Sequence, residues 1–247
     1  MKTYRDKRKP AREGIIKPLP VNLIKRIPAY LSLDTVNLNN TDIEYSEVSE
    51  KTNQTATITI NRMKAKLFPV NNYDLKQGDS LGLEAQAWLM DSVRLSLNLK
   101  ESYMDSLAGF LLSASISPVD ARILNPALIP LVSAKLESGF LDTLSMQVTG
   151  KEYVSVGEMK MYYHDLKIRL LKDGKEEGRS FIKGVLNFLA NSFIIKKSNR
   201  SRIGTVFFER LRNKSTLNYL VKITLSGISS SAGIKKSKKL LRRYKNR

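Results

Sequence analysis

Apolar and polar residues alternate along much of the chain between residues 29 and 150. Such alternation places every apolar side chain of a strand on one face, which is typical of antiparallel strands with one buried side. The clearest case is the run LGLEAQAWL at 81–89, which is followed after Met90-Asp91-Ser92 by a second run from Val93 to Leu99. The pattern predicts successive hairpins that build one long sheet.

The alternation changes phase at two points. Ile58 and Ile60 share one phase, but the apolar residues of 63–67 share the other, which predicts a β-bulge near Asn61 and Arg62. A second change of phase, between 159–163 and 166–170, predicts a bulge at His164-Asp165. This bulge accounts for the only histidine of the chain by backbone geometry alone.

Helices are predicted in three places. Proline punctuates two short helical turns at 117–131, where Asn125 is expected to cap a turn that begins with Pro126. Helical spacing of apolar residues predicts one amphipathic helix at 180–193 and another that starts at Ser215 and runs to about 228. We therefore expect a mainly β fold: a long, antiparallel, twisted open sheet that forms a β-groove, with a short Pro-punctuated helical crossover and two C-terminal amphipathic helices.

The predicted sheet has more apolar surface than these helices can cover. Such a face must pack on a second sheet, roll up, meet a partner, or hold a lipid chain, because wet apolar surface costs about 25 cal/mol per Å². Methionines would suit an adaptable apolar surface, although they are also common in ordinary cores. The residues that we expect to line a lipid-binding face are Ile58, Ile60, Leu81, Leu83, Leu95, Leu97, Met146, Val148, Met159 and Met161.

Composition adds a strong positive charge. The 247 residues contain 42 Lys and Arg against 23 Asp and Glu, which gives a formal net charge of +19. Residues 1–17 carry +5 and residues 235–247 carry +8, so the remaining +6 is spread over the body. We expect a basic disordered segment at 1–19, a β-groove domain with its C-terminal helices at 20–234, and a basic tail at 235–247.

The chemistry of the chain offers little for catalysis. It has no cysteine and one histidine, which excludes thiol nucleophiles, disulfide scaffolds and multi-histidine metal sites. We find no H-E-x-x-H, no G-x-S-x-G and no phosphate-binding glycine loop. We therefore expect no enzyme activity, no catalytic residue, no metal and no cofactor. Nor do we expect a signal peptide or a membrane-spanning helix, because no apolar run approaches the required length.

Several segments resemble one known family. They are LNPALIPLVSAKLESGFLDTLSMQVTG (124–150), GEMKMYYHDLKIRLLKDG (157–174), FLANSFIIKKSN (188–199), TVFFER (205–210) and NKSTLNYLVKITLSGISSSAGIKK (213–236). In order and spacing they are similar to the C-terminal region of AsmA-like proteins, particularly those of Bacteroidota. Residues 31–65 are similar to a repeated strand unit of the same family. The resemblance covers residues 20–236.

The resemblance implies a piece of the open β-groove of the bridge-like lipid transfer proteins, which include AsmA and TamB. The implied function is non-enzymatic: the groove binds or conducts phospholipid acyl chains between the inner and outer membranes, or supports outer-membrane assembly. It also implies a periplasmic or envelope location and, as partner, an upstream half of the groove or a membrane-anchored protein. This sequence departs from the family in that Met1 opens a charged stretch instead of a membrane anchor.

The basic tail is expected to contact an anionic membrane surface. The residues assigned to that contact are Lys235, Lys236, Lys238, Lys239, Arg242 and Arg243. The alternative is a basic, β-rich module that binds nucleic acid. The net charge favours this alternative, but the sequence has no RNP-like or KH-like motif, which disfavours it. We therefore expect no specific nucleic-acid partner. A third interpretation, a strand wall that crosses a membrane, is disfavoured by the helices and the proline-rich crossover.

Overall fold

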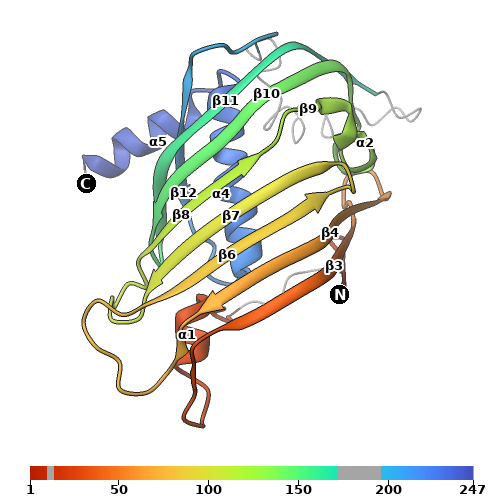
Figure 1. Cartoon of the computed structure of the whole chain (residues 1–247). Helices are drawn as coiled ribbons and strands as arrows, with labels where there is room; N and C mark the ends of the chain where they lie inside the picture. Colours follow the sequence, from red (N-terminus) through yellow and green to blue (C-terminus); the bar gives the residue numbers. More distant parts are fainter. Residues whose placement is uncertain (10–13, 172–195, 247) are drawn as a thin grey trace.

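The protein is described by a computed structural model that places residues 1–9, 14–171 and 196–246. Its centre is one long open sheet with the strand order β1-β3-β4-β6-β7-β8-β10-β11-β12, and the short β9 pairs with β10 (Figure 1). Neighbouring strands are antiparallel except β1, which pairs with β3 in parallel. The predicted fold class, a mainly β chain with a long open sheet and a few short helices, is confirmed.

The elements have the following bounds. The sheet strands are β1 (Lys2–Asp6), β3 (Val36–Val48), β4 (Thr55–Phe68), β6 (Ser80–Leu89), β7 (Val93–Ser102), β8 (Phe110–Ile116), β9 (Val119–Asp120), β10 (Ala134–Gly150), β11 (Val154–Leu170) and β12 (Ile203–Glu209). A separate small ladder joins β2 (Ser32–Leu33) to β5 (Val70–Asn71). The helices are α1 (Pro20–Ile24), the 3₁₀ turn η1 (Ala121–Leu124), α2 (Asn125–Val132), α4 (Thr216–Ser231) and α5 (Lys236–Lys245).

Both predicted bulges are present. The register of β4 against β6 shifts between Asn61 and Lys64, and Arg62 has a left-handed backbone with φ of 51°. The register of β11 against β10 also shifts beyond His164, and Asp165 has φ of 52°. Each extra residue restores the apolar phase to the same side of the sheet. The apolar face is therefore continuous along both strands.

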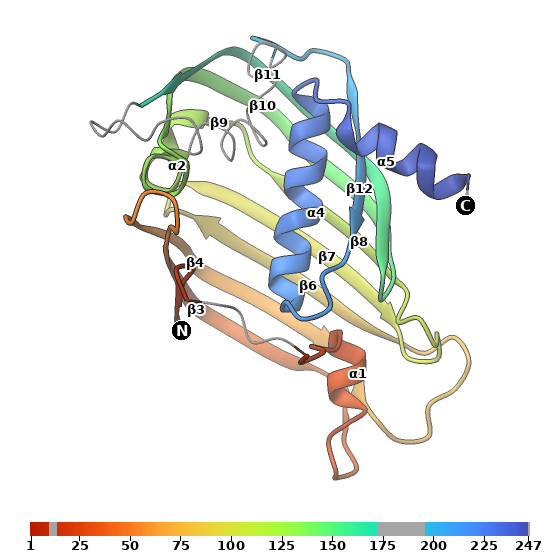
Figure 2. The ribbon, with the colours of Figure 1, turned by 180° about the vertical axis from the view of Figure 1, so that it is seen from behind.

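Helix α4 lies across one face of the sheet, over its C-terminal strands (Figure 2). Its buried side packs Tyr219 and Ile223 into a core formed with β8, β10, β11 and β12. Two glycines permit a close approach: a Cβ on Gly204 of β12 would lie 2.8 Å from the carbonyl oxygen of Gly227 in α4. The helix predicted from Ser215 is thus confirmed, and Ser215 caps it by accepting a hydrogen bond from the N–H of Asn218.

Serines of α4 also close the edge of β12. The N–H of Thr205 donates to the hydroxyl of Ser230 at 2.8 Å, and the N–H of Phe207 donates to that of Ser226 at 3.1 Å. An edge strand normally leaves such groups unpaired and open to other chains. In this protein the helix satisfies these N–H groups of the last strand.

Helices α1 and α2 lie at opposite ends of the sheet (Figures 1 and 2). Near α1, Leu19 enters the main core, and Val21 forms a second core with Val70, Leu81 and Tyr103. At the other end α2 packs against β4 and β10. The apolar face is therefore bounded at both ends and along one side by helices.

The N-terminal residues correct the predicted disordered segment at 1–19. Residues 2–6 form β1, which is paired with Glu44–Val48 of β3. Acidic residues of β3 hold this basic strand, since Lys2 lies 3.3 Å from Glu44 and Lys7 forms an ion pair with the buried Glu47. The basic N-terminal residues are therefore ordered because they pair with acidic residues of β3, which is distant in the sequence.

Within the predicted tail at 235–247, residues Lys236–Lys245 form helix α5 instead of a free extension. The spacing of Ser237, Leu240, Leu241 and Tyr244 gives it one small or apolar side. Ser237 lies 2.9 Å, hydroxyl to hydroxyl, from Ser226 of α4, and the ring of Tyr244 lies 5.6 Å from that of Phe207. The basic residues occupy the remaining, exposed sides of this docked helix.

The structure corrects the predicted helix cap at Asn125. Asn125 is not the cap of α2, because its side chain bonds both the N–H and the carbonyl oxygen of Leu136 and so ties the crossover to β10. The helix predicted at 180–193 lies outside the described residues.

Candidate functional site

Cross-strand register places all ten predicted lining residues on one face of the sheet. One row runs from Ala85 through Leu97, Ala114 and Met146 to Met159, each directly opposite the next. Parallel rows contain Leu83 and Val148, and Leu95 and Met161. Ile60 lies on the same face because it pairs with Leu89 of β6, beyond the bulge of β4. Ile58 lies two residues before Ile60 in the same strand and therefore points to the same face.

This apolar face has a fully buried part and a partly buried part. The covered residues lie in the two hydrophobic cores beneath α1 and α4, and they are Leu81, Met146, Val148, Met159 and Met161. The others are only partly buried and lie on β4, β6 and β7: Ile58, Ile60, Leu83, Leu95 and Leu97. We call these five residues the apolar strip. The structure thus divides the predicted set into an ordinary core and a strip that still meets solvent.

Helix α4 contributes more apolar surface beside the sheet. Leu217 and Val221 lie on its outer side with exposed fractions of 53% and 47%. Tyr219 and Ile223, by contrast, are buried against the sheet. The helix is therefore apolar on more of its circumference than its packing requires.

A charged cluster lies near β1 and β3. The hydroxyl of Tyr45 donates to the carboxylate of Glu47 at 2.6 Å, and burial together with this carboxylate raises the pKa of Tyr45 to about 12. Burial lowers the pKa of Lys222 on α4, and the nearby positive charge of Lys7 lowers it further, while Glu47 opposes this shift. Arg5 also lies close enough to lower the pKa of Lys222. Lys7 thus pairs with Glu47, and Arg5 and Lys222 lie near enough to interact electrostatically with this cluster.

A second polar cluster anchors the segment before α1. Glu101 is 1% exposed and accepts a hydrogen bond from the N–H of Val21. Nearby, the buried Arg210 donates to Glu152 at 2.8 Å and also to the carbonyl oxygen of Lys17. Sequence reasoning missed Glu101, although a signal exists, because it continues the apolar phase of β7 after Leu99.

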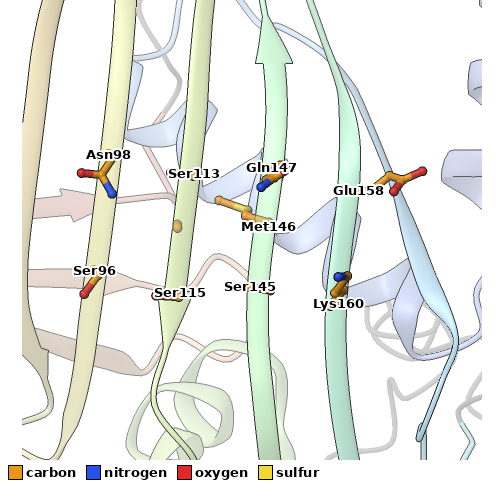
Figure 3. Close-up of a pocket in the computed structure, with 10 residues that line it drawn as sticks. Ser96, Asn98, Ser113, Ser115, Ser145, Met146, Gln147, Glu158 and Lys160 are labelled. Carbon is orange, nitrogen blue, oxygen red and sulfur yellow. The ribbon is translucent and has the colours of Figure 1, made fainter.

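The opposite face of the sheet carries two adjoining hollows of about 240 Å³ and 780 Å³. Hydroxyl and amide side chains from β7, β8 and β10 line the smaller one, together with Glu158 and Lys160 of β11 (Figure 3). The larger one adds residues of β6 and the end of β4, and the two share Asn98, Ser113, Gln147 and Glu158. Period-two alternation thus separates an apolar strip from a polar hollow across the thickness of one sheet.

The six basic residues assigned to a membrane surface lie at the start of and along α5. Lys235, Lys236, Lys238 and Lys239 are exposed, as are Arg242 and Arg243. Ser237 contacts α4 and the ring of Tyr244 lies against Phe207 of β12, although Tyr244 keeps an exposed fraction of 43%. The helix is therefore docked on the protein and presents mainly positive charge to the solvent.

His164 makes a local contact only. Its Nδ1 lies 3.0 Å from a carboxylate oxygen of Asp142 across the strand pair, and its ring lies 5.6 Å from that of Phe140. Over residues 1–9, 14–171 and 196–246, no group of three or more metal-ligating side chains is close enough to hold an ion. In the same part of the chain no helix is long and apolar enough to cross a membrane.

Comparison with protein-family models, with curated proteins and with solved structures found no match to this chain.

Proposed function

We propose that this chain is a non-enzymatic protein of the cell envelope whose apolar sheet face binds phospholipid acyl chains. The observation that supports this most strongly is the apolar strip, a set of aliphatic side chains on one face of neighbouring strands that are only partly buried. Contiguous exposed apolar surface in a folded protein usually marks a binding site. The resemblance to AsmA-like proteins points to the same ligand and to a role in phospholipid movement between membranes or in outer-membrane assembly.

The strip is suited to a flexible chain of methylene groups. Each methylene that leaves water contributes about 0.8 kcal/mol, so a chain that covers the strip with only part of its length gains several kcal/mol. The covered residues have a different role in this account. Met146, Met159 and Met161 hold α4 against the sheet, and α4 then forms one side of the lipid-binding surface with Leu217 and Val221.

The charged cluster provides a place for an anionic head group. Lys7 pairs with Glu47 of β3, and the positive charges of Arg5 and Lys222 lie in the same neighbourhood. A phosphodiester is attracted to such a cluster, and the attraction is strongest where burial excludes water. A phospholipid could therefore place its acyl chains on the strip and its phosphate near Lys222.

The partner that we propose for this chain is an upstream half of the same groove or a membrane-anchored protein, which would pair with the open edge of β3. Strand β1 covers only Glu44–Val48, and Met1 reaches the carbonyl oxygen of Asp42, so Val36–Thr41 of β3 have no paired strand on their outer side among the described strands. Such an edge can accept a further strand through its backbone groups.

The test is recovery of lipid from the purified protein. Denaturing extraction followed by mass spectrometry should find phospholipid with the wild-type chain and much less with Leu97→Asp. The matched control is Ser96→Asp, which adds the same charge one residue away on the opposite face and should leave the lipid content unchanged. If no lipid is recovered, or if both variants lose it equally, the apolar face is not a lipid site.

A further inference from the structure

The polar hollow carries hydrogen-bonding groups that the protein itself does not use. Three serines lie directly opposite one another across the sheet: Ser96 on β7, Ser115 on β8 and Ser145 on β10. In the next row Asn98, Ser113 and Gln147 do the same. The described part of the chain provides no side-chain hydrogen bond to any of these six residues.

This lack of partners is not imposed by the sheet. On the same face, Ser46 of β3 and Thr57 of β4 are also directly opposite, and their hydroxyl oxygens lie 2.9 Å apart in a hydrogen bond. The serines of the hollow are equally short and equally placed, yet they do not pair. These serines line the hollow and are at least partly accessible to solvent, so their hydroxyls can bond a ligand that enters it (Figure 3).

The charges around the hollow are balanced. Lys100 and Lys160 line it together with Glu84 and Glu158, and none of the four forms an ion pair within the described residues. A polyanion attracted by the lysines would be repelled by the two carboxylates, and a polycation attracted by the carboxylates would be repelled by the two lysines. The hollow therefore disfavours a ligand with a large net charge.

The larger part of the hollow also offers small apolar contacts. Leu111 projects from this face with an exposed fraction of 58%, and Phe68 and Val156 line other parts of the same hollow. The volume of about 780 Å³ falls within the range of sites for small ligands, roughly 300–1,000 Å³. The lining thus combines many hydroxyl and amide groups with a few apolar side chains.

We infer that this hollow binds a neutral oligosaccharide. Each sugar hydroxyl can donate one hydrogen bond and accept others. Serine hydroxyls and the carboxamides of Asn and Gln can also both donate and accept, so the two sets of groups are complementary. The C–H face of a sugar ring matches Leu111 and Val156. The site lies on the opposite face of the sheet from the apolar strip, so the inference does not depend on the proposed lipid function.

The test uses the full chain and four neutral tetrasaccharides: maltotetraose, cellotetraose, mannotetraose and tetra-N-acetylchitotetraose. Tetragalacturonate serves as the charged comparison. We expect calorimetric binding of at least one neutral sugar, and about tenfold weaker binding by the double variant Asn98→Ala/Gln147→Ala, which removes two hydrogen-bonding groups. Ser113→Phe, which fills the hollow, should abolish binding, and Thr143→Ala on the same face of β10 should leave it unchanged.

Several results would overturn the inference. One is no binding of any neutral tetrasaccharide, and another is binding that the double variant and Ser113→Phe leave intact. Stronger binding of tetragalacturonate would indicate a site for anions instead. A dimer that Ser113→Phe disrupts, seen by sedimentation without sugar, would assign this face to a second copy of the chain.

Discussion

The side-chain carboxylate of Glu101 accepts a hydrogen bond from the backbone N–H of Val21 at 3.2 Å, in the interior of the protein. This contact holds the segment that carries Leu19 and Val21 into the two hydrophobic cores. Burial raises the pKa of Glu101 to about 7, although the Val21 N–H and the charge of Arg210 oppose the shift. The negative charge of Glu152 raises the pKa of Glu101 further, whereas the positive charge of Lys25 lowers it.

The raised pKa predicts a specific dependence of stability on pH. Because the folded protein holds the proton up to about pH 7 and the unfolded chain releases it near the ordinary value of 4.5, stability should fall as pH rises between these values. The loss should approach about 3 kcal/mol and should level off above pH 7. Urea unfolding at a series of pH values should show this slope in the wild type.

Glu101→Gln removes the titration but keeps a side-chain oxygen that can accept the Val21 N–H. Its stability should therefore change much less over the same pH range than that of the wild type. Glu84→Gln, at an exposed site, is the control and should retain the wild-type slope. Parallel curves for the wild type and Glu101→Gln would show that Glu101 does not titrate in this window.

The docked position of α5 predicts purely electrostatic binding to membranes. Changing Lys238, Lys239, Arg242 and Arg243 to glutamine should weaken binding to phosphatidylglycerol-containing vesicles by on the order of 100-fold or more at low salt, because each charge contributes about 1 kcal/mol. The affinity of the wild type should fall steeply as salt is added. Vesicle co-sedimentation measures both effects.

The matched control changes the exposed Lys64, Lys66, Lys135 and Lys151 to glutamine, which removes the same charge elsewhere. It should bind vesicles nearly as well as the wild type. Equal loss in both variants would mean that net charge, and not α5, directs the protein to the membrane. Tight binding of a defined DNA or RNA sequence at physiological salt would instead favour the nucleic-acid alternative.

The pairing of β1 with β3 predicts that removal of residues 1–9 promotes self-association. This deletion exposes the outer backbone of Glu44–Val48 and leaves the buried carboxylate of Glu47 without Lys7. Sedimentation should show a larger oligomeric fraction than in the full chain at the same concentration. Lys2→Gln, which loses a surface charge but keeps the strand, should behave as the wild type, and a truncated chain no more associated than the full one would contradict the prediction.

Features set by local pattern were predictable from the sequence. Alternation at Leu81–Leu89 and the change of phase at Arg62 depend on strand geometry alone, and helical spacing after Ser215 identified α4. The common face of Ile58 and Leu97 followed from the same patterns, because the bulges restore the phase.

Features that depend on a distant partner were not predictable. The basic N-terminus becomes a strand only because Glu44 and Glu47 lie beside it, and Asn125 bonds Leu136 instead of capping its helix. The unpaired serines of the polar hollow are also ordinary solvent-facing residues in the sequence. Only the register of β7, β8 and β10 brings them together.

Photo-crosslinking from adjacent residues tests the lipid proposal most directly. Leu95 belongs to the apolar strip and Ser96 to the opposite face, so a photoreactive phenylalanine analogue at each position samples one side of the same strand. After irradiation in the presence of phospholipid vesicles, the analogue at Leu95 should carry covalently bound phospholipid by mass spectrometry, and the analogue at Ser96 should carry little. Equal labelling at both positions, or none at Leu95, would contradict the proposal that the apolar face binds acyl chains.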